Sequence, residues 1–100
     1  MSTTPVVAIF KAKPGSEETV EAFFRSVIEP THAEDGCISY QLNRDVNDPA
    51  RFVWTEEWET RASLDAHLVT EHIKTLFNEK LPGHIETEEV IILTPLAGMK

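Results

Sequence analysis

Residues 52–72 read Phe-Val-Trp-Thr-Glu-Glu-Trp-Glu-Thr-Arg-Ala-Ser-Leu-Asp-Ala-His-Leu-Val-Thr-Glu-His, and the remaining elements can be placed around this stretch. Its first part predicts a strand, in which successive side chains point to opposite faces of a sheet. One face of that strand would carry Phe52, Trp54, Glu56 and Trp58. Both tryptophans of the protein therefore share one strand face, with a carboxylate between them.

The second part of the stretch predicts a helix. Thr60 can cap this helix, because a threonine hydroxyl accepts a hydrogen bond from an otherwise unpaired amide of the first turn. Leu64, His67 and Leu68 then share one helix face through their spacing of three and four residues. The aromatic strand face, Glu56 and His67 could converge on one pocket, and this is the main functional lead in the sequence.

The rest of the chain supplies three more strands and one more helix. Apolar and β-branched or alternating segments predict strands at residues 6–13, 37–44 and 85–93. In the second of these strands, Ile38, Tyr40 and Leu42 should share one face. Residues 45–49 are rich in turn formers and predict a hairpin connection to the strand that begins the central stretch.

Helix boundaries follow from capping and helix-breaking residues. Ser16 is the expected N-cap of the first helix, and Pro30 is expected to end or kink that helix. The buried stripe of this helix, recognised by its helical spacing, consists of Val20, Phe23, Phe24, Val27 and Ile28. Thr70 can cap a new segment, so the second helix should be broken near Val69 and Thr70 and should end at Pro82.

The resulting order of elements is strand, helix, strand, strand, helix, strand. It predicts an α+β fold of the ferredoxin-like split βαβ type, with helices on one face of a four-stranded antiparallel sheet. One hundred residues suit a single domain, residues 1–100, with its core at residues 6–95. The other sheet face would carry Val53 and Thr55, which predicts a homodimer that packs one sheet on another.

Charge and composition restrict the partners. The net charge of −8 comes from 17 acidic and 9 basic side chains, and it would repel phosphate backbones and anionic lipid headgroups. We therefore expect no nucleic-acid partner and no membrane partner. Cys37 is the only cysteine, which excludes an internal disulfide and a cysteine-based zinc site. The sequence shows neither a signal peptide nor a run of roughly 18 apolar residues, so a cytoplasmic protein is expected.

Two segments of the chain carry a family resemblance. The first is Glu34-Asp-Gly36-Cys37-Ile-Ser-Tyr40. The second is Glu56-Glu-Trp58-Glu-Thr-Arg-Ala-Ser-Leu64-Asp-Ala-His67-Leu68, followed by Thr70-Glu-His72. Both resemble segments of the antibiotic biosynthesis monooxygenase (ABM) domain family. The resemblance implies a dimeric α+β barrel of two ferredoxin-like subunits, with a pocket between each sheet and its helices. Similar members include cofactor-free quinol and anthrone monooxygenases, whereas related members degrade haem or isomerise small signalling molecules.

The histidines of the central stretch are the first candidates for chemistry. A histidine on an apolar helix face is more often packed in the core than catalytic. The match of His67 to the family's helix motif favours a catalytic base, which can accept a proton near neutral pH. His72 is a second candidate, with a role in substrate binding. A metal site shared by the two is not expected on a continuous helix, where a spacing of five residues separates them by about 140°. The break expected near Thr70 keeps such a site open as an alternative.

Trp58 and Glu56 complete the expected catalytic group. Trp58, at the end of its strand, is expected at a pocket mouth, where its indole N–H can donate to a substrate oxygen. Glu56 is costly to bury unless it is paired or protonated, so a structural hydrogen bond and an acid–base role are both open. The expected substrate-binding residues are His72, Trp54, Phe52, Tyr40, Phe24, Ile28 and Leu68.

The hypothesis for function is a cofactor-independent monooxygenase that oxidises a small aromatic hydroxy compound, of quinol or anthrone type, with dioxygen. A base would remove the phenolic proton, and the electron-rich anion would react directly with dioxygen. The dinucleotide glycine fingerprint and the phosphate loop are missing, so no flavin or nicotinamide is expected. The haem-degrading branch, as the resemblance suggests, uses a first-strand asparagine, and residues 6–13 contain none. A small-molecule isomerase and a non-catalytic ligand-binding protein are the alternatives.

Overall fold

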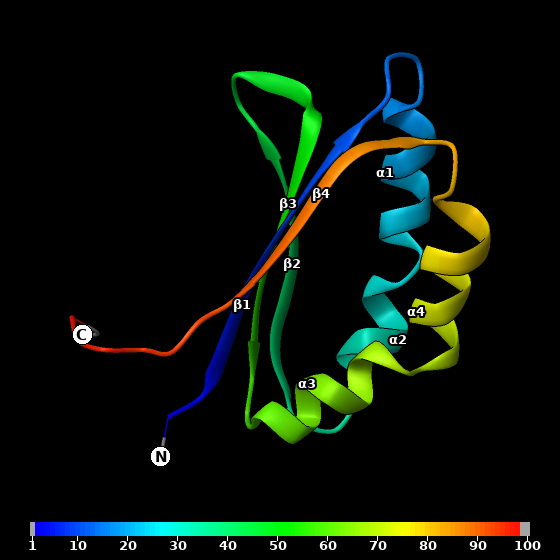
Figure 1. Cartoon of the computed structure of the whole chain (residues 1–100). Helices are drawn as coiled ribbons and strands as arrows, with labels where there is room; N and C mark the ends of the chain where they lie inside the picture. The colour runs from blue at the N-terminus through cyan, green and yellow to red at the C-terminus, as the bar shows by residue number, and fades with distance from the viewer. Residues whose placement is uncertain (1, 99–100) are drawn as a thin grey trace.

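The computed structural model describes residues 2–98 (Figure 1). In chain order the elements are β1 (Thr4–Ala12), α1 (Glu17–Arg25), α2 (Ile28–His32), β2 (Cys37–Asp45), β3 (Asp48–Trp58), α3 (Arg61–Leu68), α4 (Glu71–Thr75), a π-helical turn η1 (Leu76–Lys80) and β4 (Ile85–Ile92). The predicted order of strands and helices is confirmed, and both helical regions are interrupted. None of the helices in this part of the chain combines the length and apolar character needed to cross a bilayer.

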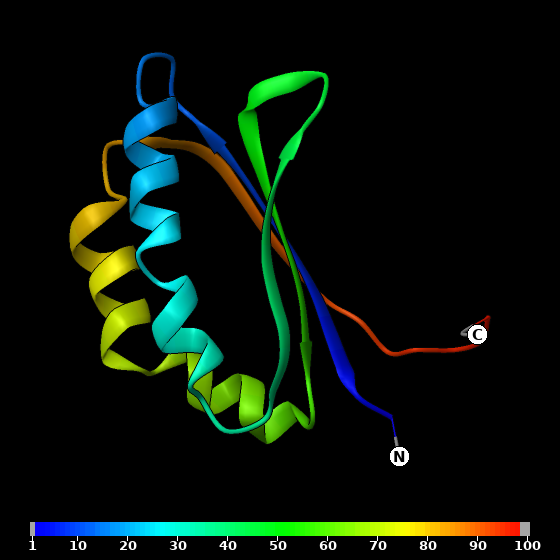
Figure 2. The same cartoon turned by 180° about the vertical axis from the view of Figure 1, so that it is seen from behind.

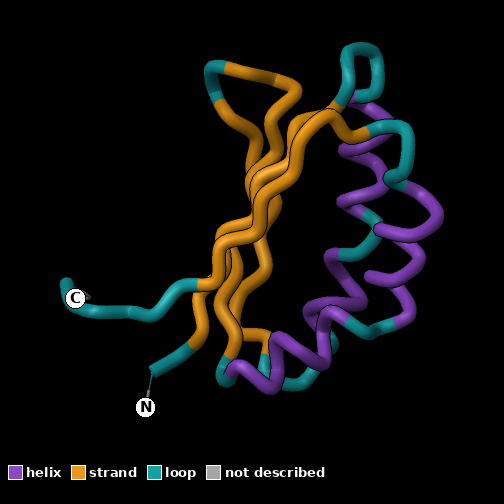
Figure 3. The backbone as a smooth tube through the Cα atoms, viewed as in Figure 1, coloured by secondary structure: helices purple, strands orange, loops and turns teal. Residues whose placement is uncertain are grey.

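The four strands form one antiparallel sheet in the order β2-β3-β1-β4. All helices lie on one side of this sheet, so the molecule has two layers (Figures 2 and 3). The predicted ferredoxin-like α+β fold is therefore confirmed. The long strand β3 lies inside the sheet between β2 and β1, which gives its helix-facing side chains neighbours on both sides.

The core lies between the helix-facing side of the sheet and the helices. On β3, Phe52, Trp54 and Trp58 are at most 2% exposed, which confirms the strand face predicted from their alternation. Phe24 of α1 is fully buried, and its ring contacts the rings of Phe52 and Trp54 at centroid distances of 5.7 and 5.5 Å. Edge-on aromatic pairs of this kind stabilise a core beyond the area that they bury.

Two of the three predicted helix caps differ in the structure. The Thr60 hydroxyl accepts a hydrogen bond from the amide of Ser63 at 3.0 Å, as predicted. Ser16 and Thr70 hold N-cap positions, but neither side chain caps its helix. The Thr70 hydroxyl instead donates to the carbonyl oxygen of His67 at 2.7 Å, so it ties the end of α3 to the start of α4.

The first helical region breaks earlier than predicted. The expectation that Pro30 would end or kink this helix is wrong, because α1 already ends at Arg25 and Pro30 lies inside α2. Proline is tolerated there, since the amides of a first helical turn have no intrahelical partner. The new helix buries Thr31 completely and leads into the loop that precedes β2.

A β-bulge at the start of β2 changes which of its side chains share one face of the strand. The register between β2 and β3 shifts between Cys37 and Ser39. Tyr40 is buried, whereas Ile38 is 49% exposed, so the prediction that these two residues share a face with Leu42 is wrong for Ile38. A bulged strand places an extra residue in the ladder, which reverses the side-chain alternation beyond it.

Candidate functional site

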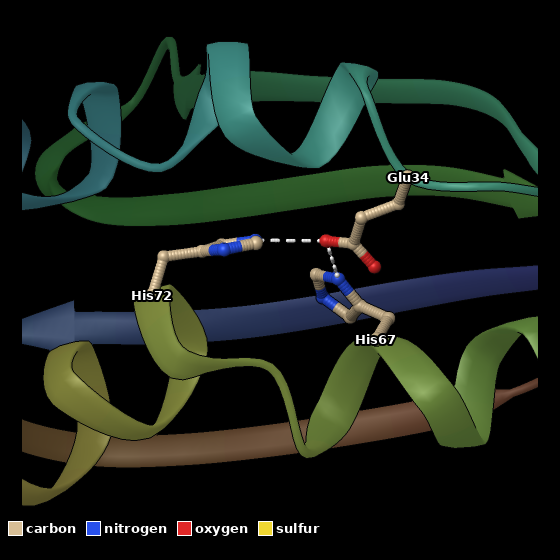
Figure 4. A group of neighbouring side chains, drawn as sticks. All are labelled: Glu34, His67 and His72. Atoms are coloured by element: carbon tan, nitrogen blue, oxygen red, sulfur yellow. Dashed lines mark hydrogen bonds and ion pairs between the residues drawn. The ribbon is translucent and has the colours of Figure 1, made fainter.

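Two histidines from consecutive helices converge on one carboxylate (Figure 4). Nδ1 of His67, in α3, lies 2.9 Å from Oε2 of Glu34, and Nε2 of His72, in α4, lies 2.8 Å from the same oxygen. The two histidines would diverge on a continuous helix, but they converge here because the helix is broken near Val69 and Thr70, as predicted. The helix α3 ends at Leu68, and the chain changes direction before α4 begins at Glu71.

Glu34 reaches the histidines from the loop between α2 and β2. Gly36 turns this loop with φ of 84°, a backbone conformation that favours glycine. A side chain at this position would collide with the hydroxyl group of Ser63 in α3, so the loop lies directly against the helix that carries His67. Only 13% of the Glu34 side chain is exposed, and its interactions with the two histidines are therefore weakly screened by solvent.

The hydrogen bond to Glu34 determines the tautomer of His67. A carboxylate only accepts hydrogen bonds, so Nδ1 of His67 carries a proton and Nε2 of the neutral ring is free to accept one. Nε2 has no hydrogen-bond partner among residues 2–98. His67 lines the cavity described below, so a ligand in that cavity could supply the missing partner.

Burial and the Glu34 carboxylate shift the pKa of His67 in opposite directions. Its ring is 3% exposed and packs against Trp58 and Tyr40 at centroid distances of 4.6 and 5.3 Å. This burial lowers the pKa of His67 below its usual range, and the hydrogen bond to Glu34 opposes the shift. The histidine is therefore neutral at neutral pH, and the nearby carboxylate stabilises the charge that it gains when it accepts a proton.

His72 contacts three oxygen atoms through Nε2. Besides Glu34, these are the hydroxyl oxygens of Thr31 at 3.2 Å and Thr70 at 3.4 Å. The His72 side chain is 23% exposed and does not line the cavity described below, so its position differs from the predicted one against substrate. It is placed to hold Glu34, which in turn orients His67.

Trp58 and Glu56 form a second polar pair. The Trp58 indole N–H donates to Oε1 of Glu56 at 3.0 Å, and Trp58 is 0% exposed. The expected position at a pocket mouth with a free N–H is therefore wrong for Trp58. Burial raises the pKa of Glu56 to about 7, against the effect of this hydrogen bond, and the Glu34 carboxylate raises it further. At neutral pH Glu56 can therefore donate or accept a proton.

A small apolar cavity of about 50 Å³ lies between the sheet and the helices. Its walls include Tyr40, Trp54, Glu56, His67 and Leu68, all of which were predicted, together with apolar residues of β1 and β4. Leu68 is 47% exposed, so it lies at the open side of the cavity. The site thus combines apolar and aromatic walls with two groups able to transfer protons, an arrangement typical of small-molecule sites.

Tyr40 and Trp54 form the flat wall of this cavity. Their rings stack at a centroid distance of 4.3 Å. Burial raises the pKa of Tyr40 far above its usual range, and the carboxylates of Glu56 and Glu34 add to the shift. The phenol of Tyr40 therefore stays protonated and serves as a neutral wall.

Three other predicted binding residues lie outside the cavity walls. Phe24 and Phe52 are fully buried in the core behind the cavity. Ile28 instead lines an open groove between the α1–α2 region and β2.

No sequence pattern assigned a role to Glu34 or Thr31. Glu34 belongs to one of the two segments that carry the family resemblance, and this was the available signal. Its partners lie 33 and 38 residues away, and no spacing rule connects them.

The fold and the site define a ferredoxin-like domain with a proton-transfer group beside an apolar pocket. Residues 5–79 match the family model described as antibiotic biosynthesis monooxygenase. The chain belongs to this family.

Individual relatives agree with this assignment. The chain is 29% identical over 100 residues to the "Probable quinol monooxygenase YgiN" of Escherichia coli, with 90% of this chain and 95% of that protein covered. It is 38% identical over 77 residues to the protein sll1783 of Synechocystis, and the match spans about half (52%) of that protein's length and 77% of this chain. The crystal structure of PA3566 from Pseudomonas aeruginosa superimposes with a TM-score of 0.90 at 30% identity, covering 97% of each chain.

Proposed function

We propose that the protein is a cofactor-independent monooxygenase that oxidises a small aromatic hydroxy compound, of quinol or anthrone type, with dioxygen. One observation carries the proposal: His67 borders the apolar cavity, and Glu34 holds its Nδ1–H so that Nε2 is a free acceptor. The likeness to YgiN, which is named as a "Probable quinol monooxygenase", supports this substrate class.

The proposed reaction begins when Nε2 of His67 removes a proton from the substrate hydroxyl, or from the acidic ring carbon of an anthrone. The resulting anion is electron-rich, and its carbon forms a bond to dioxygen, which is reduced to the level of a hydroperoxide. Loss of water then breaks the O–O bond and leaves a new carbonyl group. One oxygen atom stays in the product and the other leaves in water, so the substrate supplies all the electrons.

Glu56 is the proposed second proton-transfer group. It lines the cavity, and its pKa of about 7 lets it exist in both protonation states at neutral pH. In its protonated form it can donate to the peroxide oxygen as the O–O bond breaks. Trp58 binds this carboxyl and does not reach the cavity, so we assign Trp58 the role of positioning Glu56.

The cavity must open to admit a substrate. Its volume of about 50 Å³ is a third of the roughly 150 Å³ of an engineered cavity that binds benzene. The side chains of Leu68 and Phe77 line the cavity and are 47% and 37% exposed, so they can move outward without disturbing the core. The aromatic ring would stack against the wall formed by Tyr40 and Trp54.

Oxygen uptake with a panel of quinols and anthrones tests the proposed function. The expected result is consumption of dioxygen that depends on both enzyme and substrate, with no reaction under nitrogen. Conversion of a substrate to an isomer under nitrogen would instead indicate an isomerase. Binding of the panel compounds without any conversion would indicate a non-catalytic ligand-binding protein.

We further propose that the protein is a homodimer. Among residues 2–98 no helix covers the outer face of the sheet, where Ile91 lies opposite Val7 and is 37% exposed. Val90 and Ile92, on the helix-facing side of the same edge strand, and Leu93, which follows the strand, are also 40–54% exposed. An apolar surface of this kind is typical of an interface between subunits. Sedimentation equilibrium at micromolar concentration should give twice the chain mass of 11.3 kDa.

A matched pair of variants tests which surface forms the dimer. Ile91 pairs with Val7 on the helix-free face, so Ile91→Lys should shift the protein toward the monomer. Val46 is 96% exposed in the β2–β3 turn, and Val46→Lys should leave the mass unchanged. A wild-type monomer at these concentrations, or an intact Ile91→Lys dimer, would show that the proposed interface is wrong.

The raised pKa of Glu56 predicts a pH-dependent stability. The folded protein favours the neutral carboxyl, so this contribution is full below the usual pKa of 4.5 and is lost as the pH rises through about 7. This contribution to the free energy of unfolding is on the order of 3 kcal/mol. Glu56→Gln keeps the neutral hydrogen-bonding group and should remove this loss. Glu34, Tyr40, Trp58 and His67 surround the group and are unchanged in the variant.

Urea unfolding at pH 5 and pH 8, at one protein concentration, measures this effect. The free energy of unfolding of Glu56→Gln minus that of the wild type should be more positive at pH 8 than at pH 5, because only the wild type loses stability in this range. Glu57→Gln, on the opposite face of the same strand, is the control. Equal pH dependence in wild type and Glu56→Gln would mean that Glu56 titrates normally.

A further inference from the structure

Three side chains of the site bring possible metal-ligand atoms together, and the proposed reaction does not require them to bind a metal. One possible ligand atom each from Glu34, His67 and His72 lie within 4.8 Å of one another. Oε2 of Glu34 is 2.9 Å from Nδ1 of His67 and 2.8 Å from Nε2 of His72. They come from three segments, the loop after α2 and the helices α3 and α4, and Figure 4 shows all three side chains pointing toward a common centre. Two imidazole nitrogens and a carboxylate oxygen are ligands that zinc and neighbouring divalent transition metals accept.

We propose that Glu34, His67 and His72 bind a divalent transition metal ion such as Zn²⁺ or Co²⁺, and that the bound ion switches His67 from a proton acceptor to a proton donor. The ion would be a reversible inhibitor, not a cofactor of the reaction. The binding itself is independent of the proposed function, whereas the inhibition rests on His67 being the base.

The two contacts of Glu34 lie close to the ligand spacing that an ion requires. Zinc–nitrogen distances of about 2.0–2.1 Å place the ligands of a tetrahedral ion about 3.3 Å apart. The Glu34 oxygen is now 2.8–2.9 Å from each nitrogen, so the ligands must move apart by a few tenths of an ångström. Glu34 and His72 are 13% and 23% exposed, which gives an ion access from solvent. The net charge of −8 favours the approach of cations.

The metal and Glu34 require opposite tautomers of His67. The hydrogen bond to Glu34 needs a proton on Nδ1 and leaves Nε2 unprotonated. A metal ion on Nδ1 needs that nitrogen unprotonated, and the neutral ring then carries its proton on Nε2. The group that faces substrate therefore changes from a hydrogen-bond acceptor to a donor and can no longer remove a proton.

The surroundings indicate a reversible site instead of a permanent one. A histidine that holds a resident metal almost always donates its other ring N–H to a carboxylate, a carbonyl or water. Among residues 2–98, neither Nε2 of His67 nor Nδ1 of His72 has a protein partner of this kind. The site therefore lacks the supporting contacts that make a metal difficult to remove.

Titration of the metal-free wild-type protein with Co²⁺ alone tests the binding. We expect one ion per chain and visible absorption bands typical of Co²⁺ with few ligands, lost on addition of Zn²⁺. His72→Ala and Glu34→Gln should each weaken binding about tenfold or more, since loss of even a supporting contact costs about 10–100-fold in metal affinity. The control is His84→Ala, because His84 contacts Ser16 and not this cluster, and it should bind as the wild type does.

Nitrogen-15 NMR of the histidine side chains tests the switch without any turnover. We expect His67 to carry its proton on Nδ1 in the metal-free protein and on Nε2 after addition of Zn²⁺. If quinol oxidation is detected, Zn²⁺ should abolish it and a chelator should restore it.

Absence of Co²⁺ binding at millimolar concentration, equal binding by wild type and His72→Ala, or an unchanged His67 tautomer would overturn the proposal. A failure of the protein to oxidise quinols would leave these binding readouts intact and would count against the proposed function alone.

Discussion

Replacement of His67 by alanine is expected to lower turnover by about 10²–10⁴-fold, the usual contribution of a general acid–base group. The substrate affinity should change little, because proton removal stabilises mainly the transition state. Initial rates of oxygen uptake over a range of substrate concentrations measure both quantities. The control is His84→Ala, since His84 lies away from the cavity, bound to Ser16.

A second variant separates a lost base from a damaged fold, because His67 is only 3% exposed. His67→Asn keeps a side-chain N–H near the position of Nδ1, so it can still donate to Glu34, but it has no basic nitrogen. It should be as inactive as His67→Ala while it stays folded by circular dichroism. If a folded His67→Asn variant keeps full activity and a Glu56→Gln variant loses it, then the base has been assigned to the wrong residue.

Replacement of Glu34 by glutamine is expected to have the next largest effect, a loss of about 10²–10⁴-fold in turnover. Loss of the orienting carboxylate in a serine-protease triad, which leaves the histidine in the wrong tautomer, costs about 10⁴-fold. A glutamine can donate from its amide to Nδ1 of His67, which moves the ring proton to Nε2. It also removes the negative charge that stabilises the protonated ring. The effect should appear in kcat more than in KM.

The tautomer of His67 distinguishes this orienting role from a purely structural one. In Glu34→Gln, nitrogen-15 NMR should show an increased population of the form protonated at Nε2. Glu29→Gln, an exposed change on α2, is the matched control and should leave both the tautomer and the rate unchanged. A large loss of activity with an unchanged tautomer would assign Glu34 a different role, and full activity would remove it from the mechanism.

Local patterns predicted the fold and one wall of the site. The alternation of Phe52, Trp54 and Trp58 correctly gave the buried face of β3, and Thr60 correctly gave the start of α3. Both signals lie within a few residues of sequence, where the periods of strands and helices fix which side chains share a face. The same reasoning correctly placed His67 on a buried helix face.

The polar connections within the site could not be predicted in this way. Glu34 meets the histidines only because α2, the Gly36 turn and the packing of that turn on Ser63 together place a loop against α3. Such a contact depends on tertiary packing and leaves no periodic pattern. The assignment of Trp58 to a pocket mouth was wrong for a related reason, since the depth of a strand end depends on what the neighbouring loop and helix cover.

The two-residue connection between α3 and α4, Val69 and Thr70, sets the direction from which His72 approaches its partner. A single insertion or deletion in this connection would change how α4 is placed relative to α3, and with it the position of His72 relative to Glu34, even if every residue of the cluster were retained. When other chains of this fold are searched for the same chemistry, the length of this connection is accordingly a better criterion than the presence of the two histidines.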